Sequence, residues 1–172
     1  RYVPRAAHAA GGLGEVLVAD DAELRREVAL KRVTDTLRGH PTAIAFFERE
    51  ARAAAALSHP NIVVVYDAGQ ENGHYFMTME HLQGTTLEQI VAQRGAMSAQ
   101  VVASIGIQVC AGLHYAHTNK IIHRDIKTAN LFFTRERIVK IMDFGLAKMV
   151  EEVRKGATMI SGTPYYMAPE QA

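Results

Sequence analysis

The sequence predicts an α+β fold, because strand patterns dominate the first part of the chain and helical patterns recur from residue 41 onward. Short runs of alternating or continuous apolar residues, separated by turn residues, indicate the strands. Longer runs with apolar residues at spacings of three and four indicate the helices. The predicted strands cover 15–19, 26–33, 62–66, 74–80 and two short runs on either side of residues 134–137; the predicted helices cover 41–57, 85–94 and 98–116.

Turn and cap residues support these boundaries. Asp20-Asp21 separates the first two strands, and the run G-Q-E-N-G at 69–73 separates the next two. The first helix ends at S-H-P-N, since proline disfavours helical geometry in the residue before it. Thr85 or Thr86 can cap the second helix and Ser98 the third. Glu50 falls on or beside the apolar stripe of the first helix, where a carboxylate needs either a cationic partner or a marginal position.

The third helix is expected to bury one apolar face. The residues that this spacing places on the face are Val101, Val102, Ile105, Val109, Leu113 and Ala116. The single cysteine, Cys110, falls in the same helix and is expected to be a buried structural thiol.

Composition excludes several classes of protein. With 172 residues, 48% hydrophobic and 22% charged, the chain can form one large domain or two small lobes. A net charge of +1 gives no reason to expect nucleic acid or an acidic membrane surface as partner. No run of 18 apolar residues predicts a membrane span. One cysteine cannot form an intrachain disulfide and fits a reducing compartment, so a cytoplasmic location is expected.

The stretch from Ile121 to Gly145 carries the strongest chemical signal. Asp125 is followed five residues later by Asn130, and Asp143 stands beside a glycine after the second apolar run. If the two apolar runs form a hairpin, all three polar groups lie at one end of it. Three polar oxygen-bearing groups at one end of a hairpin suit metal-assisted chemistry better than they suit packing.

Six motifs in order make the chain resemble a eukaryotic-type serine/threonine protein kinase of bacterial kind, over essentially its whole length. They read A-A-G-G-L-G-E-V from Ala9, V-A-L-K ending at Lys31, a helical acid at Glu50, H-R-D-I-K-T-A-N from His123, D-F-G from Asp143 and A-P-E from Ala168. The resemblance implies a two-lobed fold, with an antiparallel sheet and one helix in the N-lobe and an incomplete, mainly helical C-lobe. It also implies an N-lobe at about 1–80, a hinge at 81–83 and the first part of the C-lobe at 84–172.

The resemblance implies phosphoryl transfer from ATP to Ser or Thr hydroxyls of protein substrates, with Mg²⁺ as the metal and Mn²⁺ as an alternative. Lys31 would bind the phosphates, with Glu50 orienting it. Asp125 would accept the proton of the acceptor hydroxyl or orient that hydroxyl. Lys127, two residues later, would be the lysine that serine/threonine kinases place at the γ-phosphate and that tyrosine kinases usually lack there, which implies Ser/Thr specificity. Asn130 and Asp143 would hold the metal.

The resemblance also implies the nucleotide contacts. Three glycines, Gly11, Gly12 and Gly14, would cover the phosphates with backbone N–H groups, although from the residues alone a tight hairpin turn is the favoured explanation. The adenine would lie between Val16, Ala29 and Leu131, with Met79 as gatekeeper and the backbone of Glu80 and Leu82 reading its edge. These apolar residues can equally be core.

Residues 146–167 lack periodicity, and the resemblance implies that they form the activation segment. The resemblance implies Thr158 and Ser161 as candidate regulatory phosphosites, since Arg124 precedes Asp125, and Thr163 as a residue of the substrate site. Self-association for autophosphorylation is a possible partnership, whereas this segment provides no membrane contact. A membrane anchor elsewhere in a longer parent protein is compatible with this.

Three features depart from the family pattern. Ala9 replaces the first loop glycine, Thr128 stands where many relatives have proline, and the family's further C-lobe helices do not follow Ala172. We therefore expect an exposed apolar patch, poor stability and little activity for these residues alone. The alternative function is a catalytically weak kinase-fold module that binds partners. A small-molecule phosphotransferase is disfavoured by Arg124-Asp125, the long activation segment and A-P-E.

Overall fold

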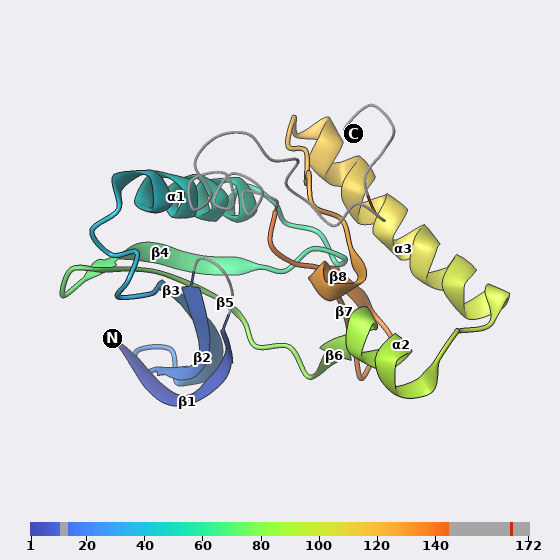
Figure 1. The fold of residues 1–172 in the computed structure, drawn as a ribbon, viewed down its shortest axis with the longest axis horizontal. Coiled ribbons are helices and arrows are strands. Elements are labelled where there is room, and N and C mark those ends of the chain that lie inside the picture. The colour runs from blue at the N-terminus through green and yellow to red at the C-terminus, as the bar shows by residue number, and fades with distance from the viewer. Residues whose placement is uncertain (11–13, 145–165, 167–172) are drawn as a thin grey trace.

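The computed structural model describes residues 1–10, 14–144 and 166, and of residues 6–10 the backbone alone. Figure 1 shows two sheets, the first with helix α1 along it and the second with helices α2 and α3 beside it, joined by the connection after β5. This is the arrangement that the resemblance predicts, with an antiparallel sheet and one helix in the N-lobe, followed by the first part of a C-lobe.

The N-lobe sheet is antiparallel and has the strand order β1-β2-β3-β5-β4. Its strands are β1 (Tyr2–Ala10), β2 (Gly14–Asp21), β3 (Arg26–Val33), β4 (Val65–Glu71) and β5 (His74–Glu80). Helix α1 (Pro41–Ala55) connects β3 to β4 and lies along the sheet (Figure 1). Its buried Phe47 and Ala51 pack against Val33 and Met77, so the helix covers the β3–β5 part of one face.

Strand register decides which side chains share that face. Val16 pairs with Lys31 across β2 and β3, and Ala29 pairs with Met79 across β3 and β5. Directly opposed residues point to the same side of a sheet, and residues two apart in one strand do so as well. Lys31 therefore shares its face with Val16, Ala29 and Met79.

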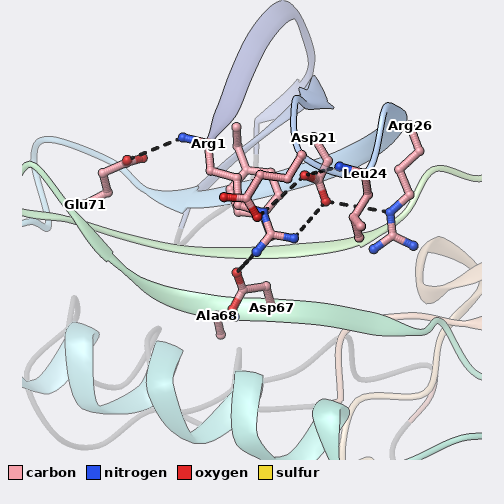
Figure 2. A network of polar contacts seen from close by, with 9 residues as sticks. Arg1, Asp21, Leu24, Arg26, Asp67, Ala68 and Glu71 are labelled. Carbon is pink, nitrogen blue, oxygen red and sulfur yellow. Dashed lines mark hydrogen bonds and ion pairs between the residues drawn. The ribbon is translucent and has the colours of Figure 1, made fainter.

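The other face is closed by the N-terminal residues. Tyr2, Leu17, Val28 and Leu30 are buried together there. The Arg1 guanidinium donates to both carboxylate oxygens of the fully buried Asp21, at 3.1 and 3.0 Å, as Figure 2 shows. A bidentate contact of this kind fixes the entry of β1 against the β2–β3 end of the sheet.

The second sheet is small and carries the C-lobe helices. It has the antiparallel order β6-β7-β8, with bounds of Gly84–Thr86, Leu131–Thr134 and Val139–Ile141. Helices α2 (Leu87–Arg94) and α3 (Ala99–Thr118) pack beside it, and a short 3₁₀ turn, η1 (Thr128–Asn130), leads into β7. The Thr86 side chain caps α2 and the Ser98 side chain caps α3. One core joins these elements, and its most deeply buried members are Ile62, Ala116, Val139 and Ile141.

Two polar contacts and a backbone bridge fasten the lobes together. Ile62 pairs with Ile141 in an isolated parallel bridge, and the Val63 N–H donates to the Ile141 carbonyl at 3.0 Å. The Glu80 carboxylate accepts from the Val64 N–H at 2.8 Å and from the Lys140 ammonium at 2.7 Å. Glu80 ends β5 and Lys140 lies in β8, so this ion pair spans the two sheets.

Two strand predictions were wrong. The prediction omitted β1, which runs from Tyr2 to Ala10. The predicted strand at 62–66 is displaced, because β4 begins at Val65 and continues to Glu71, leaving only Asn72-Gly73 as the turn. The first residues of the predicted strand, Ile62 and Val63, are apolar because they contact β8, and they do not belong to β4.

Part of the predicted face of α3 was also wrong. Ile105, Val109 and Ala116 are buried as predicted, and Leu113 packs at the margin. Val101 and Val102 are exposed, and so is Cys110, which is therefore not a buried thiol. The prediction of an exposed apolar surface is consistent with these residues and with Ile107, which is 72% exposed. Helix α3 is long and apolar enough to cross a membrane by length and composition, but one side of it belongs to the C-lobe core.

Candidate phosphoryl-transfer site

Lys31 is the centre of the polar cluster between the lobes. Its ammonium donates to Glu50 Oε1 and to Asp143 Oδ1, each at 2.7 Å. Lys31 comes from β3, Glu50 from the buried side of α1, and Asp143 from the residues after β8. Three segments distant in sequence thus place one cation between two carboxylates.

Burial and the neighbouring charges shift the pKa values of these three groups in opposite directions. Burial would lower the pKa of Lys31, but the charges of Asp143 and Glu50 outweigh it and leave that pKa above its ordinary value. The charge of Lys31 lowers the pKa of Asp143. Burial raises the pKa of Glu50 to about 7, and the nearby Asp143 charge adds to the rise while Lys31 opposes it. Lys31 and Asp143 are therefore charged at neutral pH, and Glu50 titrates close to it.

The raised pKa of Glu50 predicts a pH-dependent stability. Between the ordinary pKa of 4.5 and about 7, the folded chain holds a proton on Glu50 that the unfolded chain has released. Because the folded state binds more protons in this window, the contribution of Glu50 to stability falls as pH rises through it. We expect urea unfolding from pH 4.5 to 7.5 to show wild type losing stability relative to Glu50→Gln as pH increases. A difference that stays level or grows in favour of wild type would mean that Glu50 is ionised throughout the folded state.

The loop from His123 to Asn130 holds the second half of the site. The Asn130 side-chain amide donates to the Asp125 carbonyl at 2.8 Å and to Asp125 Oδ2 at 3.0 Å. The Lys127 ammonium lies 2.9 Å from the same Oδ2. These contacts hold the Asp125 carboxylate in one orientation. Since Asn130 uses its nitrogen on Asp125, its amide oxygen is the atom that it can offer to a cation.

His123 connects this loop to the residues before Asp143. Its Nε2 donates to the Met142 carbonyl at 2.9 Å, and its Nδ1 accepts from the Asp125 N–H at 3.2 Å. This pattern requires the neutral imidazole, and burial lowers the pKa of His123 accordingly. The ring also packs 4.8 Å from the Phe144 ring, between centroids. His123 therefore links the backbone of Asp125 to the residue that precedes Asp143.

The backbone brings the two halves together. The Met142 N–H donates to the Asn130 carbonyl at 2.9 Å, which places Asn130 next to the Asp143 segment. Two non-glycine residues of the site, Arg124 and Asp143, adopt φ values of 67° and 52°. Such conformations cost on the order of 1–3 kcal/mol each and persist where the surroundings impose them.

The predicted site residues that lie among the described residues come together in two groups. Lys31, Glu50 and Asp143 form one group, and Asp125, Lys127 and Asn130 form the other. For Glu50, the alternative of a marginal position on α1 was wrong, since the residue is buried and paired with Lys31.

Five predicted nucleotide contacts can also be placed. Val16, Ala29 and Met79 share the sheet face of Lys31, and Leu131 begins β7 in the other lobe. The Glu80 side chain is engaged by Val64 and Lys140. The Glu80 backbone N–H donates to the Val64 carbonyl at 2.9 Å, and the contact of the Glu80 backbone with adenine stays a prediction.

Several predicted residues lie outside the described part of the chain. They are Gly11, Gly12, Thr158, Ser161, Thr163 and the A-P-E motif. Gly14 is described: it begins β2, and a side chain there would meet the Arg32 carbonyl at 2.3 Å. Leu82 lies in the connection between β5 and β6.

Sequence reasoning did not assign roles to His123, Lys140 or Tyr166. His123 is part of the matched motif, so its place beside Asp125 could have been inferred. The ion pair of Lys140 with Glu80 and the contact of Tyr166 with Thr128 join residues 60 and 38 positions apart, and no local pattern indicates them.

Comparison with known proteins agrees with this geometry. The protein kinase domain family matches residues 9–172. A serine/threonine-protein kinase PknB of Mycobacterium leprae is 41% identical over 94% of this chain, and PrkC of Bacillus subtilis is 36% identical over 94%. The chain spans about a quarter of the length of these relatives, at 27% and 25%.

A solved structure gives the same result for the fold. The Mycobacterium tuberculosis PknI kinase domain superposes with a TM-score of 0.75 at 27% identity, over 92% of this chain and 65% of that one. Since the family match covers nearly all the residues, the chain belongs to the protein kinase domain family.

Proposed function

We propose that this chain forms the nucleotide and catalytic half of a serine/threonine protein kinase that transfers the γ-phosphoryl group of ATP to protein hydroxyls. The observation that carries the proposal is the buried Lys31 ammonium, held at 2.7 Å by both Glu50 and Asp143. Kinase activity requires the lysine of β3 to be paired with the helical glutamate, and here that pair is formed.

Lys31 acts as a fixed positive charge for the nucleotide phosphates. Glu50 orients it from one side, and burial of the Lys31 ammonium strengthens its attraction for a phosphate anion relative to water. Val16, Ala29, Met79 and Leu131 form the apolar surroundings of the adenine. The connection 81–83, which we propose as the hinge, offers backbone groups to its edge.

Asp143 and Asn130 suit a magnesium ion. Carboxylate and amide oxygens are the hard ligands that Mg²⁺ prefers, and Asn130 turns its nitrogen to Asp125 and not to the cation. A bound Mg²⁺ would neutralise charge on the transferred phosphoryl group. Mn²⁺ accepts the same ligands.

Asp125 orients the acceptor hydroxyl and accepts its proton. Asn130 and Lys127 hold Oδ2 of the carboxylate, so its direction is fixed before the acceptor arrives. The lysine two residues after the aspartate favours Ser and Thr over Tyr acceptors, by the resemblance noted above. Lys127 also places a positive charge beside the reacting groups.

Transfer of labelled γ-phosphate tests this function. The complete gene product that carries these residues is incubated with magnesium, labelled ATP and matched peptides that contain Ser, Thr or Tyr. We expect label on Ser and Thr, little on Tyr, and loss of transfer in Asp143→Ala. No transfer by wild type would favour the binding-module alternative, and unchanged transfer in Asp143→Ala would reject the assigned site.

A further inference from the structure

The ion pair of Lys140 with Glu80 is a contact between the two sheets that the proposed function does not use. The Lys140 ammonium lies 2.7 Å from Glu80 Oε1, and the same oxygen accepts from the Val64 N–H at 2.8 Å. The side chains of Lys140 and Glu80 are only 12% and 19% exposed. Because water is largely excluded from the pair, solvent and salt screen its attraction less than that of an exposed pair.

Each end of this pair lies next to a proposed nucleotide contact. Glu80 is the last residue of β5 and immediately precedes the proposed hinge at 81–83, whose backbone would read the adenine edge. Lys140 is the middle residue of β8, and Asp143, which would hold the metal, follows three residues later. The pair therefore links the strand that leads to the adenine subsite with the strand that leads to the metal subsite.

Backbone contacts complete a closed frame around the pair. The Ile141 N–H donates to the Asn61 carbonyl at 2.9 Å, and the Val63 N–H donates to the Ile141 carbonyl at 3.0 Å. The next residue, Val64, accepts from the Glu80 N–H at 2.9 Å. The frame thus runs from β8 through this segment to Glu80, and the ion pair closes it. Without the ion pair, the start of the hinge is attached to β8 only through the intervening segment.

We propose that Lys140 and Glu80 are a positioning pair, which fixes the separation between the adenine subsite at the hinge and the metal subsite at Asp143. This inference rests on the proposed kinase function. ATP with bound magnesium spans both subsites, and its second half meets a high effective concentration only while the subsites keep the right separation. Neither half of the nucleotide alone depends on that separation. Loss of the ion pair should therefore weaken binding of the whole nucleotide and spare binding of its parts.

Binding of the nucleotide and of its two halves tests the inference in the complete gene product. Titration calorimetry with Mg-ATP, adenosine and Mg-tripolyphosphate compares wild type, Lys140→Met, Glu80→Gln and the double variant. Glutamine keeps an oxygen for the Val64 N–H, so this change removes the charge alone.

We expect each single variant to raise the Kd of Mg-ATP by about three- to tenfold, a moderate effect because the backbone contacts of the frame remain. The double variant should raise it by no more than the larger single change, since both substitutions remove the same interaction. The Kd values of adenosine and of Mg-tripolyphosphate should change by less than about twofold.

Lys120→Met is the matched control, because it makes the same side-chain change at an exposed residue after α3. Its three Kd values should stay within about twofold of wild type. A Kd of Mg-ATP for Lys140→Met within twofold of wild type, multiplying single effects, or equal weakening of Mg-ATP and either of its halves would overturn the inference. Binding of Mg-ATP by wild type would leave the kinase function standing in each of these cases, whereas its absence would overturn both.

Discussion

Replacing Lys31 by methionine is expected to lower the free energy of unfolding by about 3–5 kcal/mol, the usual cost of breaking a buried ion pair by removing one partner. Lys31 is the cation between Glu50 and Asp143, and methionine leaves these two carboxylates facing each other without it. Because burial already raises the pKa of Glu50 to about 7, the variant should take up a proton there. The loss should therefore be smaller at pH 5 than at pH 8.

Two further variants isolate the cause. Lys31→Met combined with Glu50→Gln removes the buried Lys31 charge together with the Glu50 charge that it pairs with. The double variant should therefore recover a large part of the stability that Lys31→Met loses. Lys140→Met is the matched control, since it also removes a lysine from an ion pair, but Glu80 keeps its bond from the Val64 N–H. Urea unfolding measures all four proteins. A Lys31→Met loss no larger than that of Lys140→Met would contradict the central position of Lys31.

Replacing Asp125 by asparagine is expected to slow phosphoryl transfer by about 10²–10⁴-fold, the range for removal of a general base. Asparagine keeps the size of the side chain, and its carbonyl oxygen can still accept from Asn130. The variant loses the charge paired with Lys127 and the capacity to accept a proton. Binding of ATP should be nearly unchanged, because Lys31 and Asp143 are untouched.

Single-turnover kinetics with a Ser peptide measures the effect of Asp125→Asn apart from product release. Glu136→Gln provides the control, since it makes the same carboxylate-to-amide change in the turn between β7 and β8. That variant should react at the wild-type rate. A fall of less than about tenfold for Asp125→Asn would exclude a base or orienting role for this carboxylate.

Motif spacing predicted the chemical core of the site but not all of its supports. Lys31, Glu50 and Asp143 were identified from sequence, and the structure places them in contact. The partners of Glu80 and Thr128 were not predicted, because both contacts depend on how distant segments meet. A sequence pattern records which face a residue occupies, whereas such pairings depend on tertiary packing.

The fold was predictable where side chains alternate clearly. β2 and β3 were identified because large apolar residues recur in both. β1 was not identified, since its second half is mostly alanine, which gives little contrast between faces. Conversely, the apolar Ile62 and Val63 imitate a strand while they anchor the α1–β4 connection to β8.

Magnesium-dependent ATP binding tests most directly whether the cluster around Lys31 and Asp143 is a nucleotide site. Titration calorimetry compares wild type and Asp143→Ala, each with magnesium and with a chelator. We predict that magnesium strengthens ATP binding to wild type by about tenfold or more and to Asp143→Ala by less than about twofold. An equal effect of magnesium on both proteins, or ATP binding by neither, would contradict the assignment.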